Sequence, residues 1–360
     1  MFCRSLSARP SPTQRCSLLR PVSGVSLALL IVAAACGRSP SSPTGGSTSS
    51  TTSTVPPNSG VTGRILNGLS DQPVAGATVQ IDTLGQTTSG PDGSFSFASG
   101  GAPATRSVSV TSPDTADRLT WARVPDAVLT LSLIPSGANS TAFDQMFRTN
   151  GAALRRWVET PRLVIQRRLL RFTSIGDTSY TALAATLTDQ EVADLRQDLV
   201  LALGPLTGNA YQAFADVTVE TANENQVVPA GTNGAIVVAR VDGLKAATAF
   251  DGYTRWSWNS AGAVRMGFIM LDQAYELAGR SGRRALRAHE LGHALGYNHV
   301  TAVTSVMQQV VTTEPNQFDR DASRLAFARP LLNRFPDADP QPGTTSAAVG
   351  APATFWGGAP

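Results

Sequence analysis

The chain's only three histidines, His289, His293 and His299, lie close together in the sequence. His289 and His293 are four residues apart, one turn of a helix, so both imidazoles project from one face and can reach a single zinc ion at about 2.0–2.1 Å. Glu290 lies beside the first ligand, where its carboxylate can hold and deprotonate a water on the ion. Gly296 permits the left-handed turn that ends the helix, and His299 follows in the loop. Three nitrogen ligands leave a fourth position for water, which is typical of a catalytic zinc site.

These residues match every fixed position of the pattern HExxHxxGxxH, and the segment therefore resembles the metzincin metallopeptidases. The resemblance implies His289, His293 and His299 as ligands of one catalytic Zn²⁺, with Glu290 as general base. It also implies a methionine turn below the metal, to which Thr304–Met307 is similar, with Met307 as a hydrophobic floor and not a ligand. The chain is nearest the matrixins. Their cysteine switch is absent, because no cysteine follows Cys36.

The elements upstream of the histidines are those that the metzincin resemblance requires. A capping-box pattern starts a helix at Thr188 that runs to about residue 203, and the zinc helix is expected from about Gly282. A short closing helix is expected over 319–327. Together they predict an α+β domain over 136–340 with a mixed, mostly parallel twisted sheet. The expected strands cover 161–166, 214–220, 235–241, 254–259 and 264–271.

The strand over 254–259 resembles the antiparallel edge strand with which metzincin substrates pair. An exposed edge offers unpaired N–H and C=O groups to which an extended peptide can add. Trp256 and Trp258 share one face of this strand, as cleft wall or as buried packing. The specificity pocket is expected around residues 300–313, and residues 137–160 are either a propeptide or a structural helix.

A second metal has little support in the sequence. Asp242, Asp251 and Asp272 lie near strand ends and could help hold a structural Ca²⁺. Isolated aspartates at strand ends are more often solvated turn residues, however, so calcium is possible but unsupported.

Residues 61–135 predict an all-β sandwich, because short alternating runs are separated by turn residues. Pro73–Ala77 followed by the turn at Asp92 and Gly93 is similar to the carboxypeptidase regulatory-like, or transthyretin-like, family. This segment contains no histidine and no carboxylate cluster, so an accessory or spacer role is favoured. The expected strands cover 61–66, 77–81, 94–97, 107–110, 119–124 and 128–133.

Residues 1–35 predict an export signal, with four arginines and then a short apolar run. That run is about half the roughly 20 residues of a spanning helix. The ending Ala33-Ala34-Ala35-Cys36 resembles a bacterial lipobox, which implies acylation of Cys36 and a lipid anchor in the cell envelope, in the outer membrane or at the surface. An ordinary signal peptide cut after Ala35 is the alternative. Residues 36–60, rich in Ser, Thr, Pro and Gly, predict a flexible tether.

The net charge of +3 depends on the leader. Without its four arginines the balance is 25 basic to 26 acidic residues, so the charge gives no indication of nucleic acid binding. Residues 341–360 are expected to be a disordered tail, and the sequence does not indicate an oligomeric state.

The predicted function is that of a surface-anchored zinc endopeptidase acting on a protein or peptide substrate. Two alternatives remain open. One is a surface binding or assembly lipoprotein with an inactive or structural zinc domain, and the other is a zinc hydrolase acting on something other than peptides.

Overall fold

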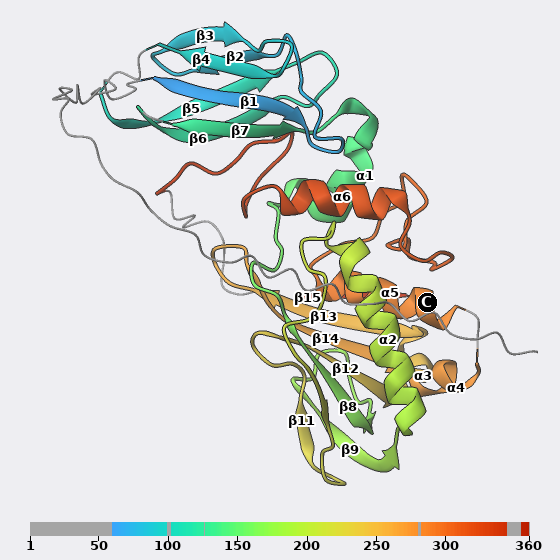
Figure 1. The fold of residues 1–360 in the computed structure, drawn as a ribbon. Helices are drawn as coiled ribbons and strands as arrows, with labels where there is room; N and C mark the ends of the chain where they lie inside the picture. The colour runs from blue at the N-terminus through green and yellow to red at the C-terminus, as the bar shows by residue number, and fades with distance from the viewer. Residues whose placement is uncertain (1–59, 99–101, 126, 280–281, 344–353, 360) are drawn as a thin grey trace, which may run out of the picture. The chain divides into compact units, whose positions relative to one another are not determined.

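The computed structural model describes residues 60–98, 102–125, 127–279, 282–343 and 354–359 (Figure 1). The predicted export signal, the lipobox at Cys36 and nearly all of the predicted tether therefore lie outside the described residues. Within the described part of the chain, none of the helices is long and apolar enough to cross a membrane.

The N-terminal part of the described chain forms two β-sheets around one apolar core. One sheet has the order β4-β1-β7 and the other β3-β2-β5-β6. Alternation places every second residue inside, as in β4, where Phe95 and Phe97 are buried and the two serines exposed. All six expected strands are present. The strands are β1 (Val61–Asn67), β2 (Thr78–Ile81), β3 (Gly85–Thr88), β4 (Ser94–Phe97), β5 (Ala104–Thr111), β6 (Arg118–Val124) and β7 (Val128–Leu133).

This arrangement agrees with the expected β-rich module, and the transthyretin-like assignment stays a prediction. The sequence did not indicate β3, because Gly85–Thr88 contains no large apolar residue. The domain boundary at residue 135 also stays a prediction. Buried ion pairs cross it, since Arg118 of β6 contacts Asp337 and Asp339.

The larger sheet has the strand order β11-β9-β8-β12-β14-β13-β15, and β10 also pairs with β8. Its strands are β8 (Arg162–Arg171), β9 (Ser179–Thr186), β10 (Val217–Glu220), β11 (Val227–Pro229), β12 (Ala235–Asp242), β13 (Gly252–Trp258), β14 (Val264–Asp272) and β15 (Thr354–Ala359). The prediction of a mixed sheet is confirmed, but the expected predominance of parallel pairing is wrong. Parallel pairing is confined to β8–β10, β8–β12 and β12–β14. The connections β8–β9 and β13–β14 are too short for a crossover, so these pairs are antiparallel.

Strand β12 is the centre of this sheet and is buried on both faces. Ile236 and Val238 contribute to the core that also contains the helices α2 and α5, whereas Ala235, Val237 and Ala239 contribute to the core on the opposite face. This division follows from the two-residue period of a strand. It explains why residues 235–239 are an uninterrupted apolar run.

The helices begin where their caps predict. The capping box of α2 (Asp189–Leu206) is formed by Thr188 and Glu191, and that of α6 (Gln317–Phe327) by Asn316 and Asp319. The metal helix α5 (Arg283–Ala294) follows Gly282. The shorter helices span few turns and were not predicted individually, although a structural helix was one alternative for residues 137–160, which contain α1. They are η1 (Ser136–Ala138), α1 (Ser140–Phe147), η2 (Thr149–Gly151), α3 (Leu244–Thr248) and α4 (Gln273–Leu277).

The expectation of a disordered tail over 341–360 needs correction at one place. Residues 354–359 form β15, which pairs with β13. The sequence of this segment has no strand periodicity, so its order depends on the main-chain groups that β13 offers along its edge.

Candidate metal centre

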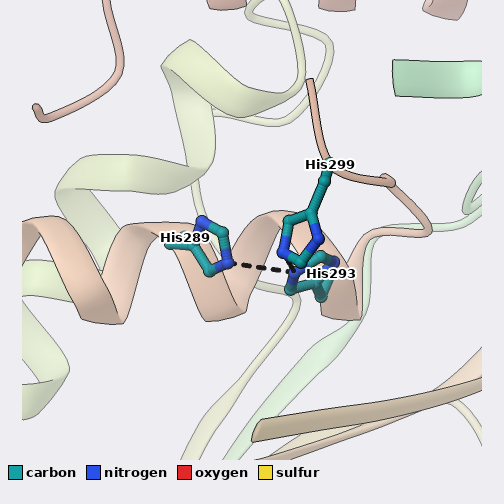
Figure 2. Close-up of side chains that lie close together, drawn as sticks. All are labelled: His289, His293 and His299. Carbon is teal, nitrogen blue, oxygen red and sulfur yellow. Dashed lines mark hydrogen bonds between the residues drawn. The ribbon is translucent and has the colours of Figure 1, made fainter. Parts of the chain in front are cut away.

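Helix α5 presents the first two histidines, and a glycine turn brings in the third. His289 and His293 lie one turn apart on a helix that is buried from Ala285 to its end. Beyond the helix, Gly296 has φ +104°, a conformation that residues with a Cβ rarely adopt. A Cβ there would also approach Val264 to 3.1 Å. The turn directs the chain back, so that His299 faces the two helical imidazoles (Figure 2).

The three side chains converge through their Nε2 atoms. Nε2 of His293 lies 3.0 Å from Nε2 of His289 and 3.1 Å from Nε2 of His299. Two nitrogens bound to one tetrahedral zinc at about 2.0–2.1 Å are separated by roughly 3.3 Å, so these spacings suit a shared ion. Among the described residues this is the one group of three or more metal-ligating side chains close enough to share an ion.

The protonation of the imidazoles supports this interpretation. Nδ1 of His289 lies 2.7 Å from the carbonyl oxygen of Val306, and Nδ1 of His293 lies 2.8 Å from that of Tyr297. Carbonyl oxygens only accept, so each Nδ1 carries the proton and each neutral ring has a bare Nε2. Two bare nitrogens 3.0 Å apart cannot hydrogen-bond to each other. A cation between them resolves this repulsion, and the ligand set therefore fits a metal ion.

Burial keeps the imidazoles neutral. It lowers the pKa of His289 to about 3, against the opposing effect of its bond to Val306. Burial and the two neighbouring imidazoles lower the pKa of His293 well below its ordinary value, and burial lowers that of His299. Neutral imidazole is the form that binds a metal, so little energy is lost to deprotonation at neutral pH.

Met307 lies directly below the helix. A Cβ on Gly292 would collide with its sulfur, so the glycine before His293 leaves the space that Met307 fills. The N–H of Val300 donates to the carbonyl oxygen of Met307 at 2.8 Å, which joins this turn to the residue after His299. Met307 is fully buried, and its role as a hydrophobic floor below the metal stays a prediction.

Asp319 of α6 holds the methionine turn, and the sequence did not single it out. Its carboxylate accepts from Ser305 Oγ at 2.5 Å and from the N–H of Val306 at 3.1 Å. The carbonyl of the same Val306 orients His289. Asp319 is thus linked through Val306 to the candidate ligand His289. The capping-box spacing from Asn316 was the local signal that could have drawn attention to it.

Helix α1 holds the loop that carries His299. Oε1 of Gln145 accepts from the N–H groups of Thr301 and Ala302 at 2.9 and 3.0 Å. The carbonyl oxygen of Met146 accepts from the N–H of Asn298 at 2.9 Å. Helix α1 also buries Phe143 and Phe147 in the core around α5. Part of the region 137–160 is thus a packed helix, and the choice between a propeptide and a structural helix stays a prediction.

The carboxylate of Glu290 lies in a narrow space between α5 and β13. Thr254 Oγ1 is 2.6 Å from its Oε2, and both residues are fully buried. On the other side, a Cβ added to Gly252 would lie 2.5 Å from Oε1. Two residues of β13 therefore fix the position of the proposed general base, and the sequence indicated neither.

The remaining candidate residues have structural contacts. Asp251 pairs with Lys245 at 2.6 Å, and Asp272 caps α4. These aspartates do not form a metal-ligating group with Asp242 in the described part of the chain, so calcium stays unsupported. Trp256 and Trp258 are both buried, with ring centroids 4.9 Å apart, which favours packing over a cleft wall.

Comparisons with known proteins agree with this geometry in part. No curated protein matches the chain. Among solved structures, a type II cohesin–X-dockerin complex from Acetivibrio cellulolyticus is 22% identical over 21% of this chain and 51% of that chain, with a TM-score of 0.17. The TIE protein of Bacillus anthracis is 9% identical over 59% of this chain and 43% of that chain, with a TM-score of 0.19. The chain thus spans about half or less of either structure, and both TM-scores are too low to support an argument.

A family model gives the informative match. Residues 211–324 match Matrixin, the family of M10 peptidases. The matched segment extends from the residues before β10 into α6, and it contains the three histidines, Glu290 and Met307. The match covers less than half of the chain; it supports a metzincin-like peptidase domain in this part and suggests a zinc metallopeptidase with a protein or peptide substrate.

Proposed function

We propose that the chain is a zinc-dependent endopeptidase that hydrolyses peptide bonds with water. The observation that carries the proposal is the convergence of three Nε2 atoms, of which those of His289 and His293 are bare, beside a helix turn that also carries the fixed carboxylate of Glu290. A structural zinc site needs no such carboxylate, and a fourth protein ligand usually closes it. The matrixin match supports the same assignment.

The chain's own residues would perform the proton transfers. A zinc ion held by the three histidines would supply a Lewis acid that polarises the peptide carbonyl and lowers the pKa of water. Glu290 accepts a proton from the attacking water, whose oxygen forms a bond to the carbonyl carbon. Glu290 then returns that proton to the amine nitrogen as the C–N bond breaks. Thr254 and Gly252 keep the carboxylate in one position during both transfers.

The substrate would lie extended along β13. This strand pairs antiparallel with β14 on one side, and its other side, where β15 pairs, is the edge that a peptide would occupy in place of β15. A peptide added there gains main-chain hydrogen bonds without any requirement on its sequence. Because α5 packs against β13, such a peptide passes beside Glu290.

The decisive experiment measures zinc content and peptide cleavage in the full chain and in its Glu290→Gln variant. One zinc per chain in both proteins, with chelator-sensitive cleavage only in the unmutated one, would establish the function. A matched control is Glu224→Gln, because Glu224 is exposed in a loop. Zinc without cleavage in any protein would favour a binding lipoprotein, and absence of zinc would contradict the proposal.

We also propose export and a lipid anchor, on the sequence of residues 1–36 alone. The acylated Cys36 would hold the peptidase in the cell envelope, at the outer membrane or surface, with residues 36–60 as a tether. Residues 61–135 would be a carboxypeptidase regulatory-like module. Labelling cells with a radioactive fatty acid tests the anchor, because a Cys36→Ser variant should lose both the label and membrane association.

A further inference from the structure

The outer edge of β13 is occupied by the chain's own C-terminal segment. Strand β15 pairs antiparallel with β13 along almost its whole length, from Ser257 opposite Thr354 to Gly252 opposite Ala359 (Figure 1). The other edge of β13 pairs with β14. Among the described strands, β15 is therefore the one that covers the edge where the proposed substrate would bind.

The register of the β13–β15 pairing places the C-terminal segment opposite the two residues of β13 that adjoin Glu290, the proposed general base. Thr254 is opposite Gly357, and Gly252 is opposite Ala359. These two residues of β13 are the ones that fix the Glu290 carboxylate. Helix α5 also lies against β15. The main chain of Gly357–Ala359 thus runs beside the residues that would act on a peptide bond.

We propose that Thr354–Ala359 is an intramolecular occupant of the substrate edge, which a peptide must displace before it can be cleaved. The occupancy rests on the strand pairing, whereas the competition with substrate rests on the proposed function. A segment of the same chain has an effective concentration on the order of mM, which is enough to exclude a weakly binding peptide.

The two glycines of the segment suit a displaceable occupant. Gly357 and Gly358 contribute no side chain, so their attachment depends on main-chain hydrogen bonds alone. Glycine in a strand also loses more conformational entropy than other residues do, which weakens the pairing. A peptide with larger side chains can add contacts that the glycines lack. The occupant would therefore select for substrates that bind through side chains as well as the main chain.

Hydrogen–deuterium exchange tests the occupancy without any measurement of activity. The full chain is compared with a Gly357→Pro, Gly358→Pro double variant, both carrying Glu290→Gln so that no cleavage can alter the tail. Proline has no N–H and cannot continue the ladder. The matched control is Ala348→Pro, which lies before β15 in the sequence. We expect β13 amides that face β15 to exchange roughly 10-fold faster in the double variant alone, with β12 amides unchanged as the control for folding.

A second measurement follows displacement directly. A fluorescein-labelled peptide Thr-Phe-Trp-Gly-Gly-Ala should bind the double variant roughly 10-fold more tightly than the full chain, because the edge is then free. Equal β13 exchange in all proteins, with equal peptide affinity, would overturn the proposal. Protection that increases with protein concentration would overturn it too, since the occupant would be a second copy. If zinc or cleavage proves absent, these two measurements still decide the occupancy.

Discussion

The hydroxyl of Thr254 lies 2.6 Å from Oε2 of Glu290 and 3.2 Å from the main-chain oxygen of the same residue. One side chain of β13 thus contacts both the carboxylate and the backbone of the metal helix. It couples the strand proposed to bind the peptide to the group proposed to move its protons. The sheet and the candidate metal centre are therefore structurally coupled. Substitutions in β13 should change the rate of cleavage even though they alter none of the three histidines.

Thr254→Val should lower kcat/KM on the order of 10-fold to 100-fold, mainly through kcat, because the carboxylate loses the donor that orients it. Valine keeps the shape of threonine, so packing is nearly unchanged. Thr254→Ser restores the hydroxyl and should recover most of the activity. Steady-state kinetics with zinc content measured in parallel provide the check. Equal kinetics for the valine and serine variants would show that the hydroxyl has no positioning role.

Gly252→Ala should inactivate the enzyme while zinc stays bound. The new Cβ would lie 2.5 Å from Oε1 of Glu290, so the carboxylate has to move. A displacement of about 1 Å can cost on the order of 100-fold in rate. Gly137→Ala is the matched control, because no atom lies within 4 Å of the added Cβ and the backbone there is unstrained. Normal cleavage by Gly252→Ala would mean that the carboxylate is not confined as described.

The convergence of the three candidate metal ligands was predictable, because it depends on residues that are close together in the sequence. The spacing of His289, His293 and His299 fixes their placement on one helix turn and the loop after it, so the structure needs little else to bring them together. Thr254 and Asp319 reach the site from other elements, through contacts that depend on how β13 and α6 pack against α5. The capping box marks Asp319 as a helix cap. No short pattern in the sequence, however, indicates the contacts that Asp319 and Thr254 make with the site.

The strands of the larger sheet likewise differ in whether the sequence predicts them. Apolar runs such as 235–239 identified the central strands, because burial on both faces leaves a strong signal. Strand β9 was missed, since 179–186 contains small and polar residues whose strand state depends on pairing with β8 and β11. Strand β15 was missed for a related reason. Its glycines have low strand propensity, and only the edge of β13 gives them partners.

Asp319→Asn should weaken zinc binding roughly 10-fold to 100-fold, although Asp319 does not touch the metal. Its carboxylate accepts from Ser305 and Val306, and an amide would turn an N–H towards one of these donors. The turn would shift, and with it the carbonyl that orients His289. Competition with a chelator measures the affinity. Asp321→Asn, on the same helix but partly exposed, should leave affinity unchanged, and a similar loss there would contradict this role for Asp319.

Glu191 should make stability depend on acid pH. Burial alone would raise its pKa, but the N–H of Thr188, the guanidinium of Arg240 and the Thr188 hydroxyl lower it to about 2. The folded pKa is thus below the unfolded value of about 4.3, so Glu191 stabilises the fold above that value and loses this effect as the pH falls towards about 2. Melting temperatures from pH 7 to pH 2 should fall more steeply for the unmutated chain than for Glu191→Gln. Parallel curves would show that Glu191 titrates normally in the fold.

Asp337→Asn should reduce the free energy of unfolding by about 3–5 kcal/mol, because it removes the charge between two buried guanidinium groups. Oδ2 of Asp337 lies 3.1 Å from Arg118 and 2.8 Å from Arg329, and all three side chains are buried. Arg118 belongs to β6, so this aspartate joins the N-terminal sheets to the segment after α6. Denaturant unfolding measures the loss, with the exposed Asp114→Asn as control. A loss no larger than that of the control would mean that water, and not Asp337, compensates the two arginines.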